Sequence, residues 1–119
     1  MQAAMIAFPY MSATSHFNQL TEAEAERLAI VIEECGEVTQ SACKILRHGY
    51  ASHNPQLERP DWLPPTNRDD LEREVGDLLH AIDRLCNAGD VRASRVIERQ
   101  HSKPNHIRQY LHHQQNEGK

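Results

Sequence analysis

Two stretches of apolar residues at helical spacing constrain the fold of this chain more than any other feature. The first begins at Thr21 and ends near Gly49, with apolar positions Leu28, Val31, Ile32, Cys35, Val38, Ala42, Ile45 and Leu46. The second begins at Asn67, with apolar positions Leu71, Val75, Leu78, Leu79, Ile82, Leu85 and Cys86. Steps of three and four residues gather these side chains on one face of an α-helix. Since no segment alternates as a strand does, the sequence predicts an all-α fold.

Signals for the ends of the helices support this prediction. Thr21 and Glu24 have the spacing of a capping box, in which each side chain satisfies a free backbone donor of the other. Asn67 is expected to cap the second helix. A third helix is expected from near Val91, and Pro104 should kink or interrupt it because proline lacks a backbone N–H.

The small size and polarity of the chain favour self-association. The chain has 119 residues and a mass of 13.6 kDa, and only 39% of its residues are hydrophobic. One domain of this kind has little apolar area to offset the loss of chain entropy. We expect an N-terminal arm over residues 1–19 and a single helical domain over residues 20–115.

Charge, cysteine content and hydropathy exclude several classes of protein. A net charge of -4 without a basic cluster argues against a nucleic-acid partner. The three cysteines, Cys35, Cys43 and Cys86, include no CxxC pair, which favours a reduced, cytoplasmic protein over a disulfide scaffold. Their apolar neighbours suggest buried thiols. No segment resembles a signal peptide or a membrane span.

Two acidic clusters carry the main functional information. Glu34 and Glu37 are three residues apart on the first helix, and Glu74 and Asp77 are three residues apart on the second. Each pair therefore projects from one helical face, beside the apolar face. If the apolar faces pack together, the four carboxylates converge and repel each other unless a cation binds them. Either cluster alone could be an ordinary solvated surface, but the two together indicate a site for Mg²⁺, which prefers oxygen ligands.

Small residues within and beside these clusters are consistent with a ligand site. Gly36 and Gly76 lie inside the clusters, although glycine destabilises a helix relative to alanine. We expect them to permit either close backbone approach or clearance for a substrate. Ser41 and Ala81, one turn away, are expected to leave room for a ligand.

The acidic clusters resemble the EExxE…ExxD motifs of the MazG-like, all-α nucleotide pyrophosphohydrolases. The first motif is Glu33-Glu34-x-x-Glu37 within the segment IEECG, and the second is Glu74-x-x-Asp77 within LEREVGDLL. The resemblance covers residues 21–88. One departure is the 36 residues between Glu37 and Glu74, more than in small members of the family, and the excess is the proline-rich segment 49–66.

The resemblance implies hydrolysis of a nucleoside triphosphate between its α- and β-phosphates, which releases a nucleoside monophosphate and pyrophosphate. It implies Mg²⁺, with Mn²⁺ as a substitute, bound by Glu34, Glu37, Glu74 and Asp77. Glu33 is the candidate for positioning or deprotonating the attacking water. It also implies a homodimer or homotetramer, in which subunits complete a four-helix-type bundle.

Candidate substrate contacts lie on both helices and in the segment between them. Lys44, Arg47 and Arg84 are expected to contact phosphates, although each could also be a solvated surface charge. Trp62 and Tyr50 are candidates for stacking on the base. The candidates for hydrogen bonds to the base are His48, Asn54 and Asn67. We expect the loop over residues 49–66 to form part of the pocket for the base and sugar, or else to serve only as a connector or an assembly contact.

Two alternatives remain open from the sequence. The same site could hydrolyse guanosine alarmones, or the chain could be a non-catalytic helical dimerisation module. The first alternative keeps the metal site and changes the substrate, whereas the second leaves the four acidic residues unexplained. The family occurs in bacteria and phages, so we expect the cytoplasm of a bacterium or of a phage-infected host.

Overall fold

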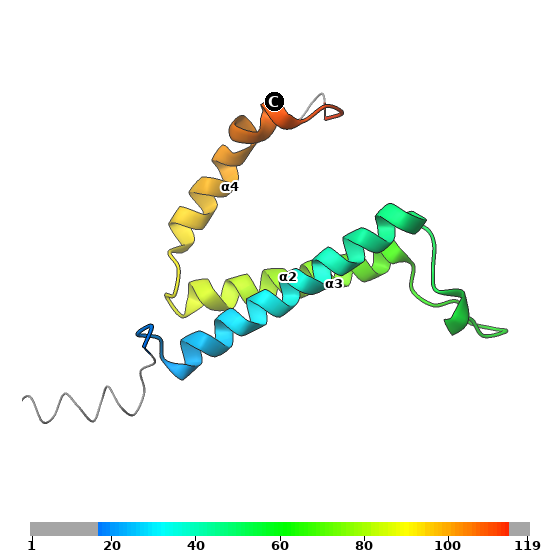
Figure 1. The fold of residues 1–119 in the computed structure, drawn as a ribbon, viewed down its shortest axis with the longest axis horizontal. Coiled ribbons are helices and arrows are strands. Elements are labelled where there is room, and N and C mark those ends of the chain that lie inside the picture. Colours follow the sequence, from blue (N-terminus) through cyan, green and yellow to red (C-terminus); the bar gives the residue numbers. More distant parts are fainter. Residues whose placement is uncertain (1–16, 115–119) are drawn as a thin grey trace, which may run out of the picture. The chain divides into compact units, whose positions relative to one another are not determined.

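The protein is all-α in the part of the chain that the structure, a computed structural model, describes, residues 17–114. It contains the helices α2 (Glu22–His48), α3 (Asn67–Asn87) and α4 (Ala93–Ile107) and two short 3₁₀ helices, η1 (Pro55–Leu57) and η2 (Arg108–Tyr110) (Figure 1). Over this range β-structure is limited to isolated bridges between single residues, without a strand. The predicted fold class is confirmed.

Helix α2 begins and ends where the sequence indicates. The Thr21 hydroxyl accepts a hydrogen bond from the Glu24 amide at 3.1 Å, and the Glu24 carboxylate accepts one from the Thr21 amide at 2.8 Å. Gly49 ends the helix with a φ of 86°, in the left-handed region that glycine adopts without strain. The predicted capping box is confirmed.

The N-cap of helix α3 is Thr66, so the prediction that Asn67 caps this helix is wrong by one residue. The Thr66 hydroxyl accepts from the Asp69 amide at 3.1 Å, and the Asp69 carboxylate accepts from the Thr66 amide at 2.9 Å. These contacts lower the pKa of Asp69, because they stabilise its charged form. Asn67 is buried instead, and its side-chain amide donates to the Gly49 carbonyl oxygen at 3.0 Å.

The segment after α3 follows the sequence prediction except at its proline. Helix α3 ends at Asn87, and Gly89 turns the chain with a φ of 81°. Helix α4 begins at Ala93, close to the predicted start. Pro104 lies inside α4, which continues to Ile107, so this residue does not interrupt the helix, and the alternative prediction of a kink stays a prediction. The chain divides after Leu85 into two structural units, and residues from Cys86 onward belong to the second.

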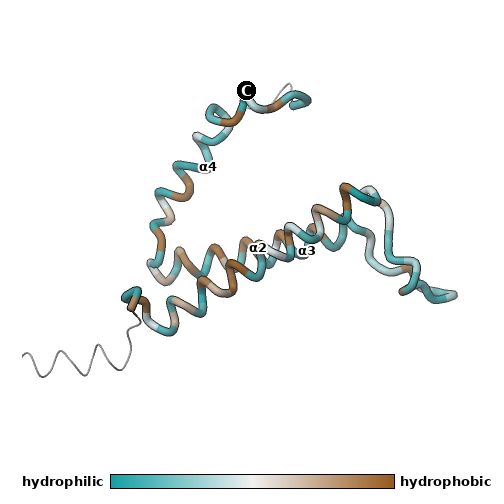
Figure 2. The backbone as a smooth tube through the Cα atoms, in the orientation of Figure 1, coloured by the Kyte–Doolittle hydropathy of each residue, from teal (hydrophilic) through white to brown (hydrophobic). Residues whose placement is uncertain are grey.

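Helices α2 and α3 lie side by side and run in opposite directions (Figure 1). Apolar residues recur along both (Figure 2), but few of them are covered. Among the described apolar residues the buried ones are Pro64 in the loop and Ala81 and Leu85 on α3, the last two at 2% and 8% exposure. Ile32 and Leu46 are 72% and 86% exposed. The apolar faces of this helical pair are therefore much larger than the contact between the two helices.

The cysteines illustrate the same point. Cys35 and Cys43 are exposed, and Cys86 is partly exposed. The prediction of buried thiols is therefore wrong for a single chain, because the apolar faces on which they lie remain uncovered. The bundle that oligomerisation would complete stays a prediction.

The loop over residues 49–66 is tied to the start of α3. The Asn67 amide donates to the Ser52 carbonyl at 2.8 Å, and the Arg68 amide donates to the Tyr50 carbonyl at 3.0 Å. The Arg68 guanidinium also lies 5.0 Å from the centre of the Tyr50 ring, in a cation–π contact. With the Asn67–Gly49 hydrogen bond, these contacts hold both ends of the loop together.

Two further predictions can be compared with the described residues. The proposed arm over residues 1–19 lies almost wholly outside them, and the single domain over 20–115 stays a prediction. Within residues 17–114, no helix is both long enough and apolar enough to cross a membrane.

Candidate metal centre

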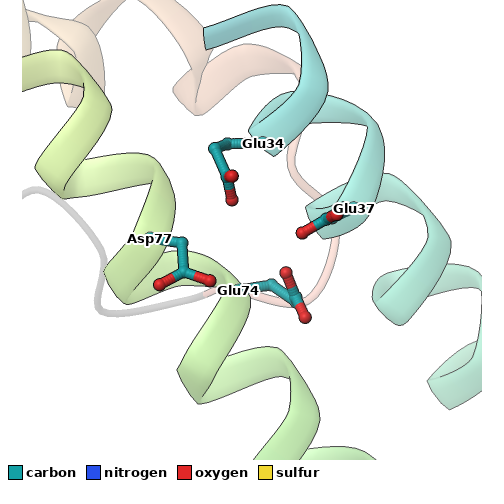
Figure 3. Close-up of side chains that lie close together, drawn as sticks. All are labelled: Glu34, Glu37, Glu74 and Asp77. Atoms are coloured by element: carbon teal, nitrogen blue, oxygen red, sulfur yellow. The ribbon is translucent and has the colours of Figure 1, made fainter. Parts of the chain in front are cut away.

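Four carboxylates from helices α2 and α3 converge on one point. Glu34 and Glu37 extend from α2 toward α3, and Glu74 and Asp77 extend from α3 toward α2 (Figure 3). One oxygen of each carboxylate lies within 4.8 Å of the corresponding oxygen of every other. The structure therefore brings together the four residues that the sequence predicts to converge.

The environment of the four carboxylates is partly dehydrated. Glu74 is buried at 8% exposure, Glu34 and Glu37 are half-buried, and Asp77 is exposed. One oxygen each of Glu34 and Glu74, Oε2 in both, is buried and has no hydrogen-bond partner. A buried carboxylate oxygen without a partner is costly, so these two atoms could be satisfied by a cation.

The pKa values of the cluster reflect its crowding. The Glu37 carboxyl forms a hydrogen bond with Glu74, and this bond and the Glu74 charge raise the pKa of Glu37 to about 7. The same hydrogen bond lowers the pKa of Glu74. Partial burial, followed by the charge of Asp77, raises the pKa of Glu34. Near neutral pH the cluster therefore retains a proton that a divalent cation would displace.

The size of the cluster fits a divalent cation. Oxygens on opposite sides of Mg²⁺ lie about 4.2 Å apart, and around Ca²⁺ they lie about 4.6–5.2 Å apart. The four carboxylate oxygens lie within 4.8 Å of one another, a limit that falls in the Ca²⁺ range and is wider than Mg²⁺ requires. Together with the two unpartnered oxygens, this spacing shows that the cluster could hold a divalent metal.

Arg73 supports the buried carboxylate of the cluster. Its Nη2 donates to Glu74 Oε1 at 3.0 Å, and its Nη1 lies 3.3 Å from Asp70 Oδ1. These contacts orient Glu74 and help to lower its pKa. Arg73 was not among the residues predicted from the sequence, although its i, i+3 spacing from Asp70 is a usable signal for an ion pair.

The small residues near the cluster have different roles from those expected. A Cβ atom added at Gly36 or Gly76 would meet nothing within 4 Å, so the described chain makes no close backbone approach there. Of the two expectations, only clearance for a ligand remains. Ser41 and Ala81 are buried. They therefore do not leave open space for a ligand, because neighbouring groups cover their short side chains.

A cavity of about 1010 Å³ adjoins the cluster. It lies between the C-terminal end of α2, the loop over residues 49–66 and the first turns of α3. Lys44 and Arg47 line it, and so does Arg73. The candidates for base recognition that line it are His48, Asn54 and Asn67.

The other predicted substrate residues lie elsewhere. Trp62 is half-exposed and pairs through a β-bridge with Arg59, and neither Trp62 nor Tyr50 lines the cavity. Arg84 is exposed on α3, outside the cavity lining. Glu33 is exposed and outside the converging group, although its charge contributes to the raised pKa values of Glu34 and Glu37. The roles assigned to these residues stay predictions.

The chain is similar to the Gene 37 protein of Mycobacterium phage L5. The two are 32% identical over 73 residues, which cover 61% of this chain and 55% of the relative. The chain thus spans about half the length of the curated relative that it matches. No family model matches the chain, and no solved structure matches it. The similarity shows a distant relationship to a phage protein.

Proposed function

We propose that this protein is a Mg²⁺-dependent nucleotide pyrophosphohydrolase, which cleaves a nucleoside triphosphate between its α- and β-phosphates to give a nucleoside monophosphate and pyrophosphate. The observation that carries the proposal is the convergence of four carboxylates within 4.8 Å, including two buried oxygens without a partner. Four carboxylates this close repel one another in the absence of a cation, and a bound cation removes this repulsion. The resemblance of both acidic motifs to those of the MazG-like family supports the same reaction.

Glu34, Glu37, Glu74 and Asp77 would hold the cation. Bound Mg²⁺ would neutralise charge on the phosphates and lower the pKa of a coordinated water. Each carboxylate must be ionised to act as a ligand, so the proton that Glu37 keeps near neutral pH leaves when the metal binds.

Glu33 is the proposed residue for positioning the attacking water or accepting its proton. It is exposed on α2, next to the metal ligands in sequence, and its charge acts on both Glu34 and Glu37. A general base must reach the water without being consumed as a ligand. The separation of Glu33 from the converging group supports this division of roles.

The exposed apolar faces support a homodimer or homotetramer, in which helices α2 and α3 of two subunits form a four-helix-type bundle. Exposed side chains such as Ile32 and Leu46 lose contact with water in such an assembly, which stabilises it. The phage relative supports action in the cytoplasm of a phage-infected bacterial cell.

A screen of nucleotides tests the proposal. The purified protein is incubated with Mg²⁺ and each of a set of nucleoside triphosphates, deoxynucleotides and guanosine alarmones, and pyrophosphate and monophosphate products are measured. Turnover of at least one nucleotide, abolished by a chelator, is expected. Absence of turnover and of any metal-dependent thermal stabilisation by nucleotides would favour the non-catalytic dimerisation module.

A further inference from the structure

The cavity beside the carboxylates has a size suited to a ligand much larger than a phosphate. Pockets for small molecules and cofactors have volumes of about 300–1,000 Å³, and this cavity reaches about 1010 Å³. All of its lining residues belong to α2, α3 and the loop between them, within one structural unit. The cavity is therefore a feature of a single chain and needs no second subunit to form.

The helical wall of the cavity carries positive charge that the described chain leaves available. Arg73 is paired with Asp70 and Glu74. Neither Lys44 nor Arg47 forms an ion pair in the range 17–114. Two cations that form no ion pair within this range give this wall positive charge, which favours an anionic ligand.

The opposite wall is mainly apolar and is held in place. Pro55, Leu57 and Pro64 line it, together with the polar residues Ser52 and Asn54 and with Glu58, which contacts His53. Apolar surface with a few fixed polar groups is typical of sites for flat, partly polar ligands such as a nucleobase. The hydrogen bonds that join the loop ends to α3 fix this wall before any ligand binds, which reduces the entropy lost on binding.

The cavity and the carboxylate cluster share a boundary. Arg73 lines the cavity, and its Nη2 donates to Glu74 at 3.0 Å. Lys44 also lines the cavity, and its charge contributes to the lowered pKa of Glu74. None of the four carboxylates lines the cavity itself, but two of its lining side chains act on Glu74, so the cavity lies next to the cluster.

We propose that this cavity holds the nucleoside part of the substrate within one subunit. Lys44 and Arg47 then face the negatively charged phosphate end of the substrate. The proposal rests on the proposed function and adds to it the location of nucleoside recognition. The base lies against the proline-rich wall, and the phosphate chain passes Lys44 and Arg73 to the four carboxylates. Recognition of the base then depends on Asn54 and its neighbours on that wall and not on Trp62.

Two variants test the cavity, and inorganic triphosphate serves as the ligand without a nucleoside. Ala51→Trp places an indole in the cavity, because Ala51 lines it. Asp61→Trp adds the same group to the same loop outside the lining and serves as the control. Arg47→Ala removes a cation from an exposed position and is expected to keep the fold, so it tests the cavity even if Ala51→Trp does not fold.

Binding is measured by calorimetry with Mg²⁺, using a non-hydrolysable nucleoside triphosphate analogue and inorganic triphosphate. We expect Ala51→Trp, because it fills part of the cavity, and Arg47→Ala, because it removes a charged hydrogen-bond donor, each to weaken binding of the nucleotide analogue about tenfold or more. Ala51→Trp should leave the affinity for inorganic triphosphate within about twofold, and Asp61→Trp should change neither affinity. Circular dichroism confirms that each variant keeps its helices.

The two ligands separate failure of the cavity from failure of the enzyme. If the wild type binds both ligands and neither Ala51→Trp nor Arg47→Ala weakens the nucleotide analogue, the cavity proposal is overturned and the proposed function stands. If Ala51→Trp weakens both ligands equally, the cavity does not recognise the nucleoside, and the proposal is also overturned. If the wild type binds neither ligand, both proposals fail together.

Discussion

The Glu37 carboxyl is hydrogen-bonded to the Glu74 carboxylate across helices α2 and α3, and the contact raises the pKa of Glu37 to about 7 while it lowers that of Glu74. One proton therefore joins the two helices in the metal-free protein. When that proton leaves, two adjacent carboxylates repel each other across the helix pair. A pH dependence of stability is therefore expected from this contact, and a divalent cation would have to displace the same proton.

The metal-free protein should lose stability as the pH rises through about 7. The pKa of Glu37 is raised from 4.5 to about 7, so its stabilising contribution is complete below pH 4.5 and is lost as Glu37 ionises. The raised pKa of Glu34 acts in the same direction. The lowered pKa of Glu74 acts in the opposite direction, but only below 4.5. Melting temperatures measured in chelator between pH 4.5 and about 7 should decrease as the pH rises. Glu37→Gln should flatten the decrease, and an unchanged slope in that variant would assign the effect to other groups.

Activity should depend on the metal and on both helices. Chelator should abolish nucleotide hydrolysis, and Mg²⁺ or Mn²⁺ should restore it. Glu37→Gln and Asp77→Asn should each lower turnover at least about 100-fold. Even substitution of residues that hydrogen-bond to metal ligands lowers metal affinity or activity about 10- to 100-fold. Pyrophosphate release provides the measurement, and circular dichroism checks that helicity is retained. A normal rate in either variant would remove that residue from the site.

The protein should sediment at micromolar concentration as a species of twice 13.6 kDa or more. Ile32→Asp should shift it toward the monomer, because a charge on an apolar contact is costly to bury. Gln40→Asp, an exposed polar position on the same helix, serves as the control. A wild-type species of 13.6 kDa would show that the apolar faces do not join copies of this chain.

Thr66→Ala should lower the free energy of unfolding by about 0.5–2 kcal/mol, as loss of an N-cap does. The Thr66 hydroxyl accepts from the Asp69 amide at 3.1 Å, and that donor has no substitute partner in the helix. Thr39→Ala is the control. The Thr39 hydroxyl donates to the Cys35 carbonyl inside α2, where backbone hydrogen bonds of the helix already satisfy that carbonyl. The midpoint of denaturant unfolding measures both variants, and equal shifts would contradict the capping role of Thr66.

The sequence predicted the helices and the converging carboxylates because both depend on local spacing. The i, i+3 separation of Glu34 and Glu37 fixes a shared face, and the flanking apolar residues indicate which helix they must meet. The position of Asn67 was less predictable, since threonine and asparagine are both good N-caps and only the path of the loop decides between them.

The contact of Arg73 with Glu74 and the position of Trp62 could not be predicted from residue spacing. The first depends on side-chain conformation, and the second depends on the path of the loop. Arg73 follows Glu72 and precedes Glu74, and neighbouring residues on a helix point in directions about 100° apart. Its contact with Glu74 depends on side-chain conformation, which spacing does not determine. Trp62 is the largest side chain of its loop, but it pairs through a β-bridge with Arg59 and does not line the cavity.

The hydrogen bond from the Asn67 side-chain amide to the Gly49 carbonyl closes the loop over residues 49–66 at its two ends, which we call its neck. Residues on the far side of such a neck can be lengthened, shortened or exchanged while the helices that carry the carboxylates keep their spacing. In the proposed function, the helices hold the metal and the phosphates, and the loop supplies most of the wall that faces the nucleoside. Exchange of the loop between Gly49 and Asn67 is then expected to change nucleoside preference while the four carboxylates stay in place.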